Sequence, residues 1–215
     1  MAQLYPDSHI EIHGFLARHY DLVMNVLSGG LYSGFISSAV SAMHIRPDDR
    51  VLDLGCGTGR NACLMHRHLS DRGYILGMDV SEEMGEQFRR KCRSYSNAAF
   101  MNHRADMPFV LDDPFDKIVM SFVLHGFPHE SRLKTLENIY NNLKPGGKFL
   151  LLDFAEFKMA EMPRFHRKVF TTVECPYAFE FVEMDWKEIL RGVGFTTFAE
   201  HHWVRNYVRL LAAMK

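Results

Sequence analysis

Short apolar runs alternate with amphipathic stretches along most of the chain. Five of the runs have the length and composition of buried strands, and they lie near residues 50–54, 74–79, 98–102, 116–121 and 147–153. Three helical patterns separate them, near residues 59–70, 82–93 and 131–143. This alternation predicts βαβ units around a mostly parallel sheet, which is the α/β class of fold.

The end of the chain follows a different pattern. Residues 196–203 and 207–214 are two β-rich runs joined by Val204, Arg205 and Asn206. Two such runs with a short connection predict a hairpin.

The 215 residues contain no repeat and no linker rich in Pro, Gly or Ser, so we expect a single domain. Residues 1–44 carry helical signals and are expected to form an N-terminal cap on a core of residues 45–215. Residues 154–185 hold many aromatic side chains. We expect this segment to form a substrate lid, and the alternative is that its aromatic residues simply pack on the core.

The most informative stretch is residues 51–59, where an apolar strand is followed by Gly55, Gly57 and Gly59. A strand, a glycine turn and a helix in succession build a ligand crevice at the strand ends of an α/β sheet. The spacing differs from the dinucleotide pattern, and no Lys with Ser or Thr follows as in a phosphate loop. Asp53 before the turn disfavours a phosphate and suits an ammonium or sulfonium group.

Five motifs in order resemble those of class I S-adenosylmethionine-dependent methyltransferases, and they cover roughly residues 45–155. They are Asp-Leu-Gly-Cys-Gly-Thr-Gly at 53–59, Ile-Leu-Gly-Met-Asp-Val-Ser at 75–81, Asn-His-Arg-Ala-Asp-Met at 102–107, Phe-Asp-Lys-Ile-Val-Met-Ser-Phe at 115–122 and Leu-Lys-Pro-Gly-Gly-Lys-Phe-Leu-Leu-Leu-Asp at 143–153. The resemblance implies a Rossmann-like, doubly wound, seven-stranded sheet with an antiparallel C-terminal strand. It also implies S-adenosyl-L-methionine as cofactor and S-adenosyl-L-homocysteine as product.

The resemblance assigns roles to acidic residues at the strand ends. Asp79 is expected to bind the ribose hydroxyls, with a helix cap or turn acid as the alternative. Asp106 is expected to bind the adenine amino group, with a loop acid before Pro108 as the alternative. The full set of expected cofactor contacts is Tyr20, Asp53, Gly55, Cys56, Gly57, Gly59, Asp79, Val80, Met84, Asp106, Met107, Ser121 and Phe122.

Residues 17–23 and 25–31 resemble the N-terminal region of the ubiquinone and menaquinone biosynthesis methyltransferases. In that reading Tyr20 closes over the sulfonium methyl group and is a candidate catalytic residue, and helix packing is the alternative. The chain departs from that group after the fourth strand, where residues 124–128 read Leu-His-Gly-Phe-Pro instead of carrying an Arg-Asn pair. His125 is the titratable candidate there, because an imidazole pKa of about 6.5 suits a general base. Its alternative role is to shape the pocket.

Composition narrows the choice of acceptor and of compartment. A net charge of −1 gives no support for nucleic-acid binding. No apolar run approaches the length of about 20 residues that spans a bilayer, and the first residues lack a signal-peptide pattern, so we expect a cytoplasmic protein. The four cysteines have no C-x-x-C spacing and the 12 histidines no H-E-x-x-H pattern, so no metal site is expected.

We therefore expect in-line methyl transfer to a small, hydrophobic or aromatic acceptor. The enzyme is expected to be a monomer or homodimer, with peripheral membrane contact if its acceptor is lipophilic. The alternatives are a non-catalytic S-adenosylmethionine-binding protein, or a methyltransferase acting on a protein or RNA. A nicotinamide-dependent oxidoreductase fits less well, because the glycine spacing differs from the dinucleotide fingerprint.

Overall fold

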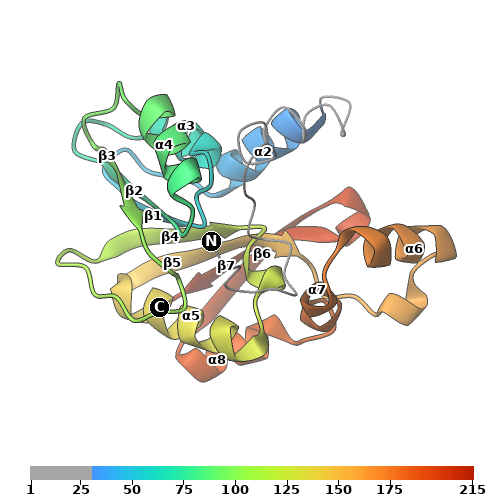
Figure 1. Ribbon diagram of the computed structural model, residues 1–215. Coiled ribbons are helices and arrows are strands. Elements are labelled where there is room, and N and C mark those ends of the chain that lie inside the picture. Colours follow the sequence, from blue (N-terminus) through green and yellow to red (C-terminus); the bar gives the residue numbers. More distant parts are fainter. Residues whose placement is uncertain (1–30) are drawn as a thin grey trace.

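The computed structural model describes residues 31–215, which form an α/β fold around one seven-stranded sheet (Figure 1). Its strands are β1 (Arg50–Leu54), β2 (Tyr74–Asp79), β3 (Ala98–Asn102), β4 (Phe115–Ser121), β5 (Leu143–Phe154), β6 (Thr197–Trp203) and β7 (Val208–Met214). Its helices are α2 (Leu31–Ala42), α3 (Arg60–His66), α4 (Glu82–Lys91), α5 (His129–Asn142), α6 (Arg164–Val173), α7 (Pro176–Phe181) and α8 (Trp186–Val193). Three short 3-10 turns are η1 (Leu124–Gly126), η2 (Met159–Glu161) and η3 (Val204–Asn206).

The strand order is β3-β2-β1-β4-β5-β7-β6. Strands β1 to β5 pair in parallel, whereas β7 is antiparallel to both β5 and β6. The order turns around between β1 and β4, and a doubly wound sheet binds its ligand outside the carboxyl ends of the strands at such a point. The predicted fold class, the antiparallel C-terminal strand and the predicted hairpin are therefore confirmed.

Alternation along the strands divides the core between the two faces of the sheet. Val51 and Val119 pack with residues of α2, α3 and α4, and Figure 1 shows these helices together on one face. Leu52 and Ile118 point the other way, into a cluster that includes residues of α5, α7 and α8. Apolar residues at successive positions of β1 are thus explained, because both faces of this strand are buried.

Local signals fix the start of two helices. The Ser81 hydroxyl accepts the backbone N–H of Met84, which caps α4, and Asp185 caps α8 by accepting the N–H of Glu188. Acidic side chains in the first turn of α4 add a favourable interaction with the helix dipole.

The observed start of β5 differs from the expected one near residue 147. Leu143 pairs with Phe115, and the register then shifts so that Lys148 pairs with Lys117. The residues between Leu143 and Lys148 therefore bulge within one strand, and Gly146 provides the positive φ of 75° in this bulge. The helix expected over 59–70 is also shorter and ends at His66.

The segment of residues 154–185 carries η2, α6 and α7, and lies beyond the carboxyl end of β5 (Figure 1). Its aromatic residues divide between the two roles expected for them. Phe170 and Phe181 are buried and pack on the core, whereas 74% of Phe165 is exposed. Of the helices in residues 31–215, none has the length and apolar character needed to cross a membrane.

Candidate active site

The glycine turn after β1 is held against β2 by backbone hydrogen bonds. The N–H groups of Gly55 and Cys56 both donate to the carbonyl of Met78, over 2.8 and 3.1 Å. A side chain at Gly59 would lie 2.7 Å from the ring of Phe88, so packing alone requires glycine there. At Gly57 the φ angle is 51°, and a Cβ would meet no described atom within 4 Å. The turn therefore leaves space beside Gly57, where a ligand can approach the backbone.

Asp53 lies beneath this turn and is 1% exposed. Its Oδ2 atom has no hydrogen-bond partner among residues 31–215. Burial, with smaller contributions from Asp79 and Cys63, raises the pKa of this carboxyl to about 8. A buried carboxylate without a partner is costly, so this position favours either a proton or a cationic ligand group.

Asp79 ends β2 and holds the glycine turn and the start of α4 together. Its Oδ2 accepts the N–H of Gly57 and its Oδ1 accepts the N–H of Ser81, each over 2.9 Å. Of the apolar residues that follow, Val80 is half-buried and Met84 is buried.

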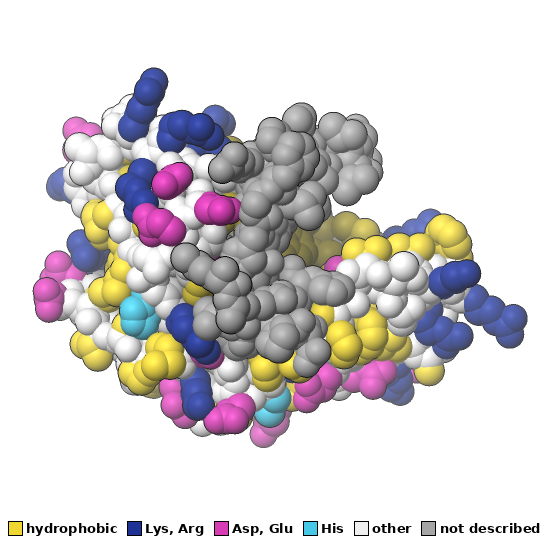
Figure 2. All heavy atoms as spheres, in the orientation of Figure 1, with side chains coloured by type: hydrophobic (Ala, Val, Ile, Leu, Met, Phe, Trp, Pro, Cys, Tyr) yellow, Lys and Arg dark blue, Asp and Glu magenta, His cyan; other side chains and the backbone are white. Residues whose placement is uncertain are grey.

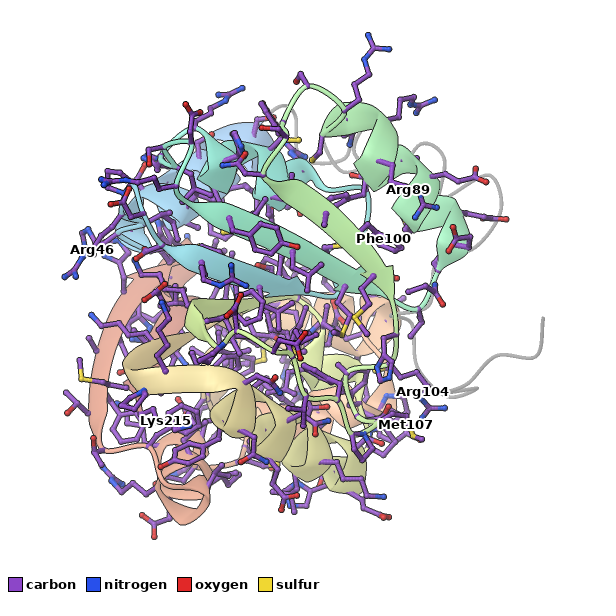
Figure 3. The ribbon with its side chains drawn as sticks, turned by 90° about the vertical axis from the view of Figure 1, so that its left-hand side faces the viewer. Arg46, Arg89, Phe100, Arg104, Met107 and Lys215 are labelled. Carbon is purple, nitrogen blue, oxygen red and sulfur yellow. The ribbon has the colours of Figure 1, made fainter. Side chains whose placement is uncertain are left out.

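Asp106 is buried after β3 and is bound to neighbouring side chains. Its two oxygens accept hydrogen bonds from Arg104 Nε and Nη2 over 2.9 and 2.8 Å, and Ser131 Oγ donates to Oδ2 over 3.0 Å. Met107 beside it is 49% exposed. Figure 3 shows Arg104 and Met107 near the end of β3, on the opposite side of the view from Arg46. Arg104 therefore competes for the carboxylate that was expected to bind adenine.

Two expected cofactor contacts lie at the end of β4. The buried Ser121 hydroxyl has no partner within the described part of the chain. Phe122 has a φ angle of 54°, a left-handed conformation that is unusual for an aromatic residue. Its ring lies between Phe35 of α2 and Phe154, at centroid distances of 6.1 and 6.3 Å. The strained backbone at Phe122 thus places an aromatic ring at the carboxyl end of the sheet.

His125 and Asp153 form a buried pair at the carboxyl ends of β4 and β5. Nδ1 of His125 lies 2.7 Å from Oδ1 of Asp153, and its Nε2 lies 3.5 Å from Oε2 of Glu174. Burial alone would lower the pKa of His125, but the charge and hydrogen bond of Asp153 outweigh it, so the pKa is raised. The carboxylate also fixes the orientation of the ring, leaving Nε2 directed toward Glu174.

Arg132 of α5 is a fully buried cation that supports this pair. Its guanidinium donates to the carbonyls of Leu124, His125 and Tyr177, over 3.3, 3.0 and 2.6 Å. Nη1 also lies 3.3 Å from Glu180. The side chain therefore joins η1, which carries His125, to α7 in the segment after β5.

A cavity of about 420 Å³ opens beside Glu174. Aromatic and aliphatic side chains form most of its wall, and it lies between α6, η3 and the end of β5. Its lining includes Phe154, Phe157, Met162, Phe170, Glu174 and Tyr207. Glu174 faces both this cavity and the imidazole of His125, so it connects the apolar space to the buried pair.

The structure brings together the expected residues of β1, β2 and β4, while Tyr20 lies outside the described residues. Sequence reasoning missed Asp153, Glu174 and Arg132. Asp153 had a usable signal, because it ends a buried run as Asp53 and Asp79 do. Within residues 31–215, no group of His, Cys, Asp or Glu side chains has the arrangement of a metal site.

A family model and individual sequence relatives both match this chain to methyltransferases. Residues 51–147 match the family described as a methyltransferase domain. A demethylmenaquinone methyltransferase from Symbiobacterium thermophilum is 33% identical over 147 residues, covering 66% of this chain and 57% of the relative. A ubiquinone/menaquinone biosynthesis C-methyltransferase from Vibrio campbellii is 32% identical over 150 residues, covering 68% of this chain. The chain spans 57% of the length of both relatives.

Solved structures share the fold at lower sequence identity. A SAM-dependent methyltransferase from Aquifex aeolicus aligns with a TM-score of 0.63 at 21% identity, covering 83% of this chain and 88% of that one. The 1,6-didemethyltoxoflavin-N1-methyltransferase of Burkholderia thailandensis aligns with a TM-score of 0.62 at 17% identity, covering 93% and 87%. Because sequence relatives and fold agree, the chain belongs to the class I S-adenosylmethionine-dependent methyltransferases and resembles their ubiquinone and menaquinone biosynthesis group.

Proposed function

We propose that this chain transfers a methyl group from S-adenosyl-L-methionine to a small hydrophobic or aromatic molecule bound in the cavity between α6 and η3. The observation that carries the proposal is the His125–Asp153 pair, connected through Glu174 to an apolar cavity at the carboxyl end of the sheet. Such a cavity suits an acceptor that is mostly apolar and has one group able to lose a proton.

The residues around the glycine turn fit the cofactor of this family. The unpartnered oxygen of Asp53 suits its amino group, and the space beside Gly57 suits close approach to the backbone. Asp79 would bind the ribose hydroxyls, with Val80 and Met84 beside the adenine. Asp106 would bind the adenine amino group after exchanging part of its contact with Arg104. When bound, the cofactor supplies a methyl group on a positively charged sulfur, which a nucleophile displaces in line.

The chain's own contribution is then positioning, exclusion of water and removal of a proton. Phe154, Phe157 and Phe170 would hold the acceptor through apolar contacts, and α6 with α7 would act as a lid. His125 would accept the acceptor's proton, either directly or through Glu174. Asp153 would stabilise the imidazolium that forms.

One relative is named a demethylmenaquinone methyltransferase and another a ubiquinone/menaquinone biosynthesis C-methyltransferase, which makes a reduced quinone ring one acceptor to test. Such a ring has a flat apolar body and acidic hydroxyl protons, and both properties match the cavity and the pair behind it. The identity of the methylated atom follows from the product. Nuclear magnetic resonance of that product distinguishes methylation at oxygen, nitrogen, sulfur or carbon, because the chemical shift of the new methyl group depends on the atom that carries it.

The test combines binding and turnover. Calorimetry should show that wild type and His125→Gln bind S-adenosyl-L-methionine alike, whereas Asp79→Ala loses most of the affinity. Formation of S-adenosyl-L-homocysteine with phenols, hydroquinols and heteroaromatic hydroxyl compounds should be rapid for wild type and slow for His125→Gln. Absence of cofactor binding by folded wild type would refute the proposal. Binding without turnover on any acceptor would favour a non-catalytic binding protein.

A further inference from the structure

Exposed hydrophobic side chains gather on one part of the surface. Among residues 31–215, seven large hydrophobic residues are exposed, and four of them border the cavity mouth. These four are Phe165, Val169, Val173 and Val204, with exposed fractions of 74, 47, 61 and 61%. Figure 2 shows hydrophobic side chains over the region of α6, with Lys and Arg side chains close by. Clustering of this kind marks an interaction surface, because single exposed residues would be scattered.

The sequence of α6 places this apolar surface on one side of the helix. Phe165, Val169 and Val173 recur every fourth residue and therefore share a side, next to the buried Phe170. Arg164, Arg167 and Lys168 occupy other positions of the same helix, which contains no Asp or Glu. Helix α6 thus combines an apolar stripe with three basic side chains at its other positions.

The tip of the β6–β7 hairpin extends this surface. Val204, Arg205 and Asn206 have φ angles of 50, 54 and 67°, so three successive non-glycine residues adopt a left-handed backbone. Such conformations are costly for residues with side chains. Here they present Val204 and Arg205 to solvent beside α6, and both side chains border the same cavity as the helix.

The basic side chains on this surface have no acidic partners within the part of the chain that the structure describes. Arg164, Arg167, Lys168 and Arg205 form no ion pair with any residue between 31 and 215. This contrasts with nearby Lys158, which lies 3.4 Å from Glu161. Four unpaired cations around an exposed apolar stripe attract an anionic surface, although the chain as a whole carries a net charge of −1.

We propose that α6 and η3 form a membrane-docking face for bilayers that contain anionic lipids. The apolar stripe inserts at the level of the upper acyl chains, and the four cations bind lipid phosphates around it. A bilayer fits better than a protein partner, because a helix with an apolar stripe and basic residues on its other positions matches the pattern of helices that lie in a membrane interface. Docking would also place the cavity mouth against the bilayer, where lipophilic molecules are concentrated.

Vesicle flotation tests the proposal without any methyl acceptor. Protein comprising residues 1–215 is mixed with vesicles of phosphatidylcholine alone, or of phosphatidylcholine with phosphatidylglycerol. Wild type should float with the anionic vesicles, and binding should weaken at high salt. Each lost cation should reduce binding roughly fivefold, so Arg164→Gln/Lys168→Gln should reduce it by more than tenfold. Phe165→Ser/Val169→Ser should abolish flotation at any salt concentration.

Matched controls separate docking from general effects on the protein. Val110→Ser removes a side chain that is 88% exposed away from this face, and Arg90→Gln removes an exposed cation of α4. Both should float like wild type, and thermal melting should show that every variant is folded. Flotation of Phe165→Ser/Val169→Ser at the wild-type level would overturn the proposal. So would a wild-type dimer that this variant dissociates, combined with no vesicle binding, because the face would then join two copies of the chain.

Discussion

Nδ1 of His125 lies 2.7 Å from Oδ1 of Asp153, and both side chains are almost completely buried. The pair joins two neighbouring strands where they end, since His125 follows β4 and Asp153 lies near the end of β5. A buried imidazole would ordinarily lose its proton more easily, but Asp153 reverses the direction and raises the pKa. Asp153 can therefore raise the pKa of His125 without contacting the methyl acceptor itself.

The first prediction concerns the pH dependence of turnover. If His125 is the base, kcat of wild type should rise with pH through a pKa above the ordinary value of about 6.5. Asp153→Asn should shift this profile to lower pH, because it removes the main stabilisation of the imidazolium. Nuclear magnetic resonance of the His125 ring should report the same shift. His125→Gln should lower kcat by roughly 10²–10⁴ and leave cofactor affinity unchanged.

The same pair should affect stability with a definite sign. A histidine whose pKa is raised on folding stabilises the protein below its unfolded pKa, and this contribution is lost as pH rises through the folded pKa. Wild type should therefore lose more stability than Asp153→Asn over that interval, as measured by urea unfolding at several pH values. If the free energy of unfolding changed with pH in the same way for both proteins, Asp153 would not be what raises the pKa of His125.

A second prediction concerns Asp53 and proton release. Its folded pKa of about 8 lies above the ordinary carboxyl value of 3.8, so the free protein keeps a proton there at neutral pH. A cationic amino group favours the ionised form, so binding of S-adenosyl-L-homocysteine near neutral pH should release a proton from Asp53. Calorimetry in two buffers of different ionisation enthalpy measures that proton. Asp53→Asn should bind more weakly and release none, and equal release by both proteins would contradict the assignment.

A third prediction separates two glycines of the same turn. Gly59→Ala would place a Cβ 2.7 Å from the Phe88 ring and 3.2 Å from its Cα, so we expect a large loss of thermal stability. Gly57→Ala meets no described atom within 4 Å, and its cost should be limited to the left-handed backbone, about 1–2 kcal/mol. Its main effect should be weaker cofactor binding. Calorimetric titration with the cofactor, at temperatures where both variants are folded, measures this affinity. If Gly57→Ala bound the cofactor as tightly as wild type, the prediction would be wrong.

Much of the fold was predictable because its signals are local. Val51, Leu52 and Leu54 identify a doubly buried strand, and the glycines after them identify a turn that only a few folds use. The positions of Asp53 and Asp79 near the carboxyl ends of their strands were also predictable, because each acid comes at the end of an apolar run. The start of β5 was not predictable, since the bulge after Leu143 depends on how that segment pairs with Phe115.

The residues missed from sequence depend on tertiary contacts. Glu174 reaches His125 only because α6 and α7 fold over the end of β5, and no spacing in the sequence reports that contact. Arg132 resembles an exposed residue of an amphipathic helix, but it is fully buried and donates a hydrogen bond to the carbonyl of Tyr177 in α7. Tyr20 stays a prediction, because it lies outside the described residues.

The last prediction follows from this buried position of Arg132. Its guanidinium supplies the donors for the carbonyls of His125 and Tyr177, and burial lowers its pKa despite nearby carboxylates. Arg132→Leu would leave these carbonyls without a donor, so unfolding in urea should show a loss of about 3–5 kcal/mol. Arg191→Gln, which breaks an exposed ion pair with Glu188, should change stability by less than about 1 kcal/mol. A similarly small effect of Arg132→Leu would mean that α7 and η1 are held together by apolar packing alone. If Arg132 positions His125 as well, the milder Arg132→Lys should lower kcat without changing cofactor affinity, because one ammonium group cannot reach all the carbonyls that the guanidinium binds.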